Sequence, residues 1–136
     1  NRDSWVIGSD QIALFNDNVL GKPLTNDNAI KQLTQFSGRQ VLFVTGICLI
    51  NSERNICLYN ESLTKVLFKN LSSNQIKNYL NKDNPLDCAG SFKIESCGPL
   101  LFDKIESDDP SSLEGLPLIA LGKLFDKVGI DLLELN

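Results

Sequence analysis

The 136-residue sequence contains no histidine and no methionine. Without histidine, mechanisms that pair a serine or cysteine nucleophile with histidine are excluded, and so are histidine metal ligands. Acid–base chemistry must therefore use Asp, Glu, Lys, Tyr or Cys side chains. Because there is no initiator and the sequence opens on Asn1, we expect the chain to be N-terminally incomplete.

The sequence also lacks the features of membrane-spanning, secreted and nucleic-acid-coating proteins. No stretch approaches the ~18 apolar residues of a membrane-spanning helix, and no signal peptide is visible. No basic stripe is present, and the net charge is -4. The sequence therefore predicts a cytoplasmic protein that binds neither nucleic acid nor membrane. A nucleotide substrate stays possible, because it needs only a few local cations.

The sequence has four cysteines but no C-x-x-C pair, so zinc or thioredoxin-like chemistry is not indicated. We expect reduced thiols. Two of them fall in the strands of a predicted hairpin, where we expect small core residues. The four are Cys48, Cys57, Cys88 and Cys97.

What is present is typical of one globular domain spanning residues 1–136, with 42% hydrophobic and 22% charged residues. Apolar periodicity, caps and turn residues predict three helices and about six strands, an α/β fold with a mixed sheet. The expected helices are 26–37 after Thr25, 73–82 after a Ser72 capping box, and 117–128. The expected strands are a buried one at 5–9 that continues at 12–15, a short return at 19–20, a hairpin at 40–51 and 56–69, and strands at 92–95 and 100–105.

The first candidate site residues are Asp10, at the predicted end of an apolar strand, and Lys22 between Gly21 and Pro23. A carboxylate there can hold a divalent cation or take a proton from water, and the ammonium group can bind phosphate. The alternatives are a turn aspartate and a solvated lysine.

A second candidate region follows small residues at 89–91, which let a ligand approach the backbone. Lys93 and Glu95 are two apart on a predicted strand and would share a face, where they form either a phosphate and base site or an exposed ion pair. Thr45-Gly46 marks either a close approach to substrate or a bulge. Four acidic residues form either a metal site or a solvated loop: Asp103, Glu106, Asp108 and Asp109.

Six segments in order and register resemble the Maf family of nucleoside triphosphate pyrophosphatases. They are Gly8-Ser9-Asp10-Gln11, Gly21-Lys22-Pro23-Leu24-Thr25, Leu33 with Ser37-Gly38, Thr45-Gly46, Cys88-Ala89-Gly90-Ser91-Phe92-Lys93 and Gly115-Leu116-Pro117-Leu118-Ile119-Ala120-Leu121. Gln11 and Cys88 are similar to the YceF-like branch, which hydrolyses 7-methyl-GTP. The branch acting on dTTP and UTP usually has threonine and an Asp-Lys-Ala-Gly run at these places.

The resemblance implies a hydrolase acting on acid anhydrides, in which water attacks the α-phosphorus and the monophosphate and pyrophosphate are released. It places the proton acceptor and metal ligand on Asp10, the motif lysine on Lys22 and a second lysine on Lys93. Specificity positions fall on Gln11 and Glu95, and Thr45 is a further expected substrate contact. The implied cofactor is Mg or Mn, and the implied assembly is a homodimer.

The resemblance also implies a Maf/ITPase-like sheet flanked by helices, here without the family's N-terminal strand, phosphate-binding loop and helix. In this interpretation the protein removes modified nucleotides from the nucleotide pool. Two alternatives are a dTTP/UTP pyrophosphatase and a non-enzymatic inhibitor of septum formation that acts through protein partners.

Overall fold

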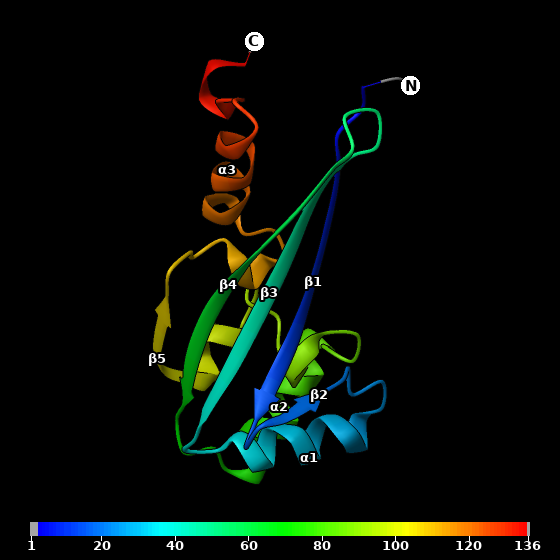
Figure 1. Ribbon diagram of the computed structural model, residues 1–136. Coiled ribbons are helices and arrows are strands. Elements are labelled where there is room, and N and C mark those ends of the chain that lie inside the picture. Colours follow the sequence, from blue (N-terminus) through cyan, green and yellow to red (C-terminus); the bar gives the residue numbers. More distant parts are fainter. Residues whose placement is uncertain (1–2, 136) are drawn as a thin grey trace. The chain divides into compact units, whose positions relative to one another are not determined.

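The computed structural model describes residues 3–135, which form an α/β fold (Figure 1). The strands are β1 (Val6–Phe15), β2 (Asn18–Leu20), β3 (Gln40–Asn51), β4 (Ile56–Phe68) and β5 (Phe102–Ser107). The helices are α1 (Asn26–Phe36), α2 (Ser73–Asp83) and α3 (Leu118–Lys127). Four 3-10 turns complete the described chain: η1 (Ala89–Ser91), η2 (Gly98–Leu101), η3 (Ser112–Glu114) and η4 (Leu132–Glu134).

The strands form one sheet in the order β2-β1-β3-β4-β5, with neighbouring strands antiparallel. β2 pairs with the last three residues of β1, from Ala13 opposite Leu20 to Phe15 opposite Asn18. Asn16 and Asp17 make the connecting turn with positive φ angles of 49° and 65°, a conformation that Asn and Asp tolerate. The predicted α/β class is confirmed, but the sheet is antiparallel and not mixed as predicted.

Contacts divide the described chain into two compact units. Unit 1 comprises residues 3–11, 44–63 and 107–135, and unit 2 comprises residues 12–43 and 64–106. The core of unit 1 forms where β3 residues Ile47 and Leu49 meet the apolar face of α3, including Leu124 and Phe125. Trp5 packs edge-on against Phe125, with ring centroids 5.8 Å apart.

The core of unit 2 is a chain of aromatic contacts. Phe36 of α1 packs against Phe15 and Phe68, and Phe92 packs edge-on against Phe43, with centroid distances between 5.1 and 5.3 Å. Such edge and tilted pairs add to the stabilisation that burial supplies. They place α1 and the segment around Phe92 on the strands of this unit.

The predicted helix boundaries are accurate because their signals are local. Thr25 caps α1 by accepting a hydrogen bond from the backbone N–H of Asn28, and Ser72 and Gln75 form the predicted capping box of α2. α2 ends at Asn84 in the left-handed conformation. The predicted 40–51 and 56–69 hairpin is also confirmed as β3 and β4.

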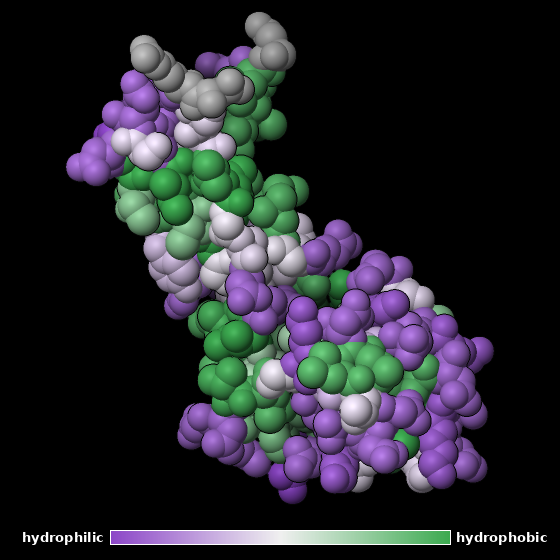
Figure 2. All heavy atoms as spheres, turned by 90° about the vertical axis from the view of Figure 1, so that its right-hand side faces the viewer, coloured by the Kyte–Doolittle hydropathy of each residue, from purple (hydrophilic) through white to green (hydrophobic). Residues whose placement is uncertain are grey.

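Three local predictions were wrong. Residues 92–95 are not a strand, because the chain turns there to contact α2, and the last strand begins at Phe102 after a 3-10 turn. The start of β1 is not buried: Val6 and Ile7 are 57% and 43% exposed. Hydrophobic residues such as these are coloured green in Figure 2. Cys57 is exposed rather than in the core, because it points away from the packed face of β4.

Candidate functional site

Asp10 and Gln11 lie within β1 of unit 1, not at the strand's end as predicted. Successive strand residues point to opposite faces, so the two side chains diverge. Asp10 is exposed, and its Oδ1 accepts a hydrogen bond from the backbone N–H of Gln11 at 2.8 Å. Its carboxylate is therefore accessible to water and to a ligand.

The Gln11 side chain is half-buried and held by two acceptors. Its Nε2 donates to Thr45 Oγ1 at 2.9 Å and to the Ser112 carbonyl oxygen at 3.2 Å. Thr45 Oγ1 in turn donates to the Ser112 carbonyl at 3.2 Å. Thr45 is 1% exposed, so its hydroxyl contacts Gln11 and the Ser112 carbonyl rather than solvent.

Ser9, two residues before Gln11 on the same face of β1, also holds this region. Its hydroxyl lies 3.1 Å from the Gly46 carbonyl oxygen and 2.5 Å from the Gly115 carbonyl oxygen. A Cβ atom on Gly46 would lie 2.9 Å from the Tyr59 hydroxyl oxygen. A side chain at position 46 would therefore have to displace the exposed Tyr59 ring.

Asp109, assigned above to either a metal site or a solvated loop, is instead a buried anchor of unit 1. Its carboxylate accepts hydrogen bonds from the backbone N–H and hydroxyl of Ser111 and, at 2.7 Å, from the backbone N–H of Ile119. Burial raises the pKa of Asp109, but these hydrogen bonds outweigh burial and hold the pKa below its ordinary value. Its own carbonyl accepts from Ser112 Oγ. In the sequence, this anchoring role of Asp109 was indicated by the Asp-Pro-Ser-Ser pattern that precedes a helix.

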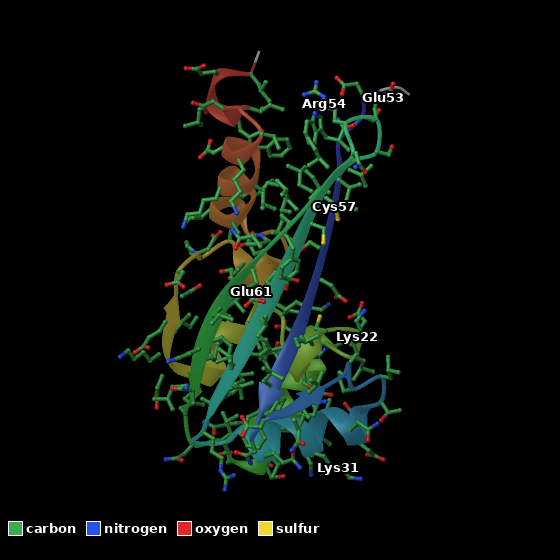
Figure 3. The ribbon with its side chains drawn as sticks, viewed as in Figure 1. Lys22, Lys31, Glu53, Arg54, Cys57 and Glu61 are labelled. Atoms are coloured by element: carbon green, nitrogen blue, oxygen red, sulfur yellow. The ribbon has the colours of Figure 1, made fainter. Side chains whose placement is uncertain are left out.

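In unit 2, Lys22 is exposed on the segment that follows β2, where Figure 3 labels it. The residues on either side are fixed to α1: the Gly21 carbonyl accepts from Gln32 Nε2, and the Pro23 carbonyl accepts from Asn28 Nδ2, both at 3.1 Å. The backbone carrying Lys22 is therefore well ordered, although its ammonium group is in solvent.

Lys93 and Glu95 lie in a turn fastened to the end of α2. The Lys93 backbone N–H donates to the Tyr79 hydroxyl oxygen at 2.8 Å, and Asp83 accepts from Ser96 Oγ at 2.7 Å and from the Cys97 backbone N–H at 2.9 Å. The expected shared strand face does not exist, because residues 94–97 form a turn.

Electrostatics agrees with this anchoring. Burial raises the pKa of Asp83, but hydrogen bonds from Ser96, Tyr79 and the Cys97 backbone, together with the charge of Lys93, hold it below its ordinary value. Burial also raises the pKa of the Tyr79 hydroxyl well above its usual range. Both groups therefore keep the protonation state that the turn requires at neutral pH.

The small residues at 89–91 serve packing. Gly90 has a φ of 77°, and a Cβ atom there would lie 2.7 Å from the Phe43 ring. Ser91 is fully buried and donates to Gln32 Oε1 at 2.5 Å. The segment was predicted to let a ligand approach, but an aromatic ring occupies the space beside Gly90.

Of the two alternatives for the acidic residues, the solvated loop describes three of the four. Asp103, Glu106 and Asp108 are exposed, and Glu106 pairs with Lys104 at 2.7 Å. Within residues 3–135, no three carboxylate or thiol side chains lie close enough together to hold a metal ion.

Among the described residues, none of the helices has the length and apolar character needed to cross a membrane.

The family model of Maf-like proteins matches residues 1–128. The chain belongs to the Maf family. It is 48% identical over 131 residues to a 7-methyl-GTP pyrophosphatase of Pseudoalteromonas translucida, covering 94% of this chain and 63% of that protein. It is also 48% identical over 131 residues to one of Colwellia psychrerythraea, covering 96% and 66%. This chain thus spans less than two thirds of the length of these relatives.

The family predicted from the motifs is confirmed, and the Maf motif residues divide between the units. Asp10, Gln11 and Thr45 lie in unit 1, with Gln11 bonded to Thr45. Lys22 lies in unit 2 beside α1, and the turn with Lys93 and Glu95 is anchored to α2 in that same unit. Joint action of the two groups of residues stays a prediction. Sequence reasoning misassigned the role of Asp109 and missed the other residues that hold each group in place: Ser112, Gln32, Tyr79 and Asp83.

Proposed function

We propose that this protein hydrolyses 7-methyl-GTP to 7-methyl-GMP and pyrophosphate. The observation that carries the proposal is the name shared by the relatives, which are 41–48% identical to this chain over most of its length. Water supplies the oxygen that bonds to the α-phosphorus, the α–β anhydride bond breaks, and pyrophosphate leaves. We also propose that residues 1–136 act as one domain, in the cytoplasm and as a homodimer.

Each motif residue has a proposed role suited to its chemistry. Asp10, exposed on β1, orients the attacking water and accepts its proton. The ammonium groups of Lys22 and Lys93 offset phosphate charge. Gln11 and Glu95 recognise the base, and a carboxylate such as Glu95 accepts hydrogen bonds from the N1–H and amino group of a guanine. A 7-methylguanine ring is positively charged, which favours that carboxylate further.

A divalent cation fits this chain in one way. Asp10 is an exposed carboxylate, and no cluster of three ligands exists among residues 3–135. Mg²⁺ is commonly held by one or two carboxylates together with substrate phosphates and water. We therefore propose that Asp10 and the triphosphate hold Mg or Mn together, and such a cation would stabilise charge on the phosphates.

The test is a turnover panel with Mg or Mn, using the longest form of the protein that its gene encodes. Pyrophosphate release is measured from 7-methyl-GTP, GTP, dTTP and UTP. We expect 7-methyl-GTP to be preferred, and we expect Asp10→Asn to lower kcat about 10²- to 10⁴-fold, the usual contribution of a positioned base. Asp126→Asn, an exposed aspartate on α3, is the matched control and should keep full activity.

Each alternative function predicts a different result in this turnover panel. Preference for dTTP or UTP would replace the substrate assignment. Full activity in Asp10→Asn would remove the proposed base. No turnover of any triphosphate by the wild-type protein would reject the enzymatic proposal and favour a role in septum formation through protein partners.

A further inference from the structure

We propose that Thr45 is a positioning residue that fixes the Gln11 amide with its carbonyl oxygen turned toward the ligand. The Gln11 position then selects a purine that carries an exocyclic amino group. This inference rests on the proposed function and deepens it, because it predicts which part of the base is recognised at Gln11.

The orientation of the Gln11 amide follows from the number of hydrogens that Thr45, Ser112 and Gln11 can each donate. The Thr45 hydroxyl has one proton, and the Ser112 carbonyl 3.2 Å away can only accept, so that proton is directed to Ser112. The Thr45 oxygen is then an acceptor for Gln11. Gln11 Nε2 carries two hydrogens, and these go to Thr45 Oγ1 and to the Ser112 carbonyl. Both donors of the amide are thereby used, and its carbonyl oxygen is the group left for a ligand.

The opposite orientation is unfavourable. Turning the amide over would set Gln11 Oε1 against the Ser112 carbonyl, which has no hydrogen to offer. Thr45 is 1% exposed and Ser112 is fully buried, so water does not readily replace the lost hydrogen bonds. The amide is therefore fixed by its buried partners.

The Ser112 carbonyl is itself held in place. Ser112 Oγ donates to the Asp109 carbonyl at 2.7 Å, and the Asp109 carboxylate binds the backbone N–H at the start of α3. Ser9 fastens the same loop to β1 through the Gly115 carbonyl. The acceptor that orients Gln11 thus belongs to a loop fixed at both of its ends.

A carbonyl oxygen can only accept a hydrogen bond, so the ligand must present a donor. A guanine base offers an exocyclic amino group that hypoxanthine lacks. A site built to bond a substrate N–H discriminates strongly against an analogue without it, because its own polar group is left unpaired. Since Gln11 is half-buried rather than fully buried, we expect a preference of about 10- to 100-fold.

The experiment compares kcat/KM for 7-methyl-GTP and 7-methyl-ITP in the wild-type protein, Thr45→Val and Thr45→Ser. The wild type should prefer 7-methyl-GTP about 10- to 100-fold. Thr45→Ser keeps a hydroxyl and should keep that ratio. Thr45→Val removes one of the two acceptors that hold Nε2, so the Ser112 carbonyl alone positions the amide, and the ratio should fall at least about threefold below that of the wild type. A merely structural role would lower both activities together and leave the ratio unchanged.

Several results would overturn the inference: a wild-type ratio near one, an unchanged ratio in Thr45→Val, or a lost ratio in Thr45→Ser. If Thr45→Val does not unfold cooperatively, Thr45→Ala provides the same loss of hydroxyl without a misplaced methyl group. If the wild type hydrolyses neither nucleotide, the proposed function fails, and calorimetric binding of the same two nucleotides tests the inference by the same ratios. Failure of both nucleotides to bind also rejects it.

Discussion

Each unit contains a buried aspartate that accepts several hydrogen bonds and fixes a turn. In unit 1, Asp109 binds Ser111 nearby in sequence and the Ile119 backbone N–H at the start of α3. In unit 2, Asp83 at the end of α2 binds Ser96 and the Cys97 backbone N–H, 13 and 14 residues later. Asp109 thus holds the beginning of a helix, whereas Asp83 closes a loop.

The difference shows how to separate structural carboxylates from reactive ones. Asp83 and Asp109 are 8% and 3% exposed, and their hydrogen bonds lower the pKa of each carboxyl group. Asp10 is exposed, and its one described hydrogen bond comes from the next residue. A carboxylate surrounded by protein donors cannot readily hold water or a cation as well, so Asp10 is the candidate for chemistry.

The largest effect should come from removing the two anchors. We expect Asp109→Ala and Asp83→Ala each to lower the free energy of unfolding by about 3 kcal/mol, because each removes several charge-assisted hydrogen bonds to a buried carboxylate. Urea unfolding followed by circular dichroism measures both. Asp10→Asn serves as the exposed control and should change stability by less than about 0.5 kcal/mol. Equal losses at all three positions would refute the distinction.

The second largest effect should be a dependence of folding stability on pH. The folded pKa of Asp83 and of Asp109 lies below the ordinary value of 3.8, so the charged forms stabilise the fold. This stability is complete above the unfolded pKa and is lost as pH falls through the depressed folded pKa. Melting temperatures should therefore be level from about pH 7 to 5 and fall below about pH 4. Asp109→Ala should show a shallower acid decline, and a parallel decline would contradict the assignment.

The part of the fold fixed by neighbours in sequence was predictable. The Thr25 cap, the Ser72 capping box and the long hairpin depend on residues a few positions apart. The turn holding Lys93 was not predictable, because its apolar alternation resembles a strand and its partners, Tyr79 and Asp83, lie on a different element. Contacts distant in sequence override local propensity in such places.

In the candidate site, too, features that depend on neighbouring residues were predictable and contacts between distant residues were not. Asp10 and Gln11 were found from motif positions, but their surroundings were not. The roles of Thr45 and Ser112 depend on a hydrogen-bond network that joins β1, β3 and a loop more than 60 residues further along the chain. Motifs thus identify candidate ligand-binding residues more readily than the residues that orient them.

The smallest expected effect is on the free energy of unfolding when either of two buried serines of unit 1 is changed to alanine. Ser62 Oγ has no hydrogen-bond partner among the residues that the structure describes, whereas Ser112 Oγ donates to the Asp109 carbonyl. The same change to alanine should therefore have opposite signs. Ser62→Ala removes a buried hydroxyl that lacks a partner and should raise the free energy of unfolding by about 0.5 kcal/mol, while Ser112→Ala should lower it by about 1 kcal/mol.

Urea unfolding of the two variants side by side, with the wild type in the same series, measures this difference. A loss of stability in Ser62→Ala as large as that in Ser112→Ala would mean that the Ser62 hydroxyl is bonded in solution, for example to a buried water. The opposite signs would instead show that the Asp109 turn is stabilised by the bonds its polar atoms make, since burial of a hydroxyl by itself opposes folding.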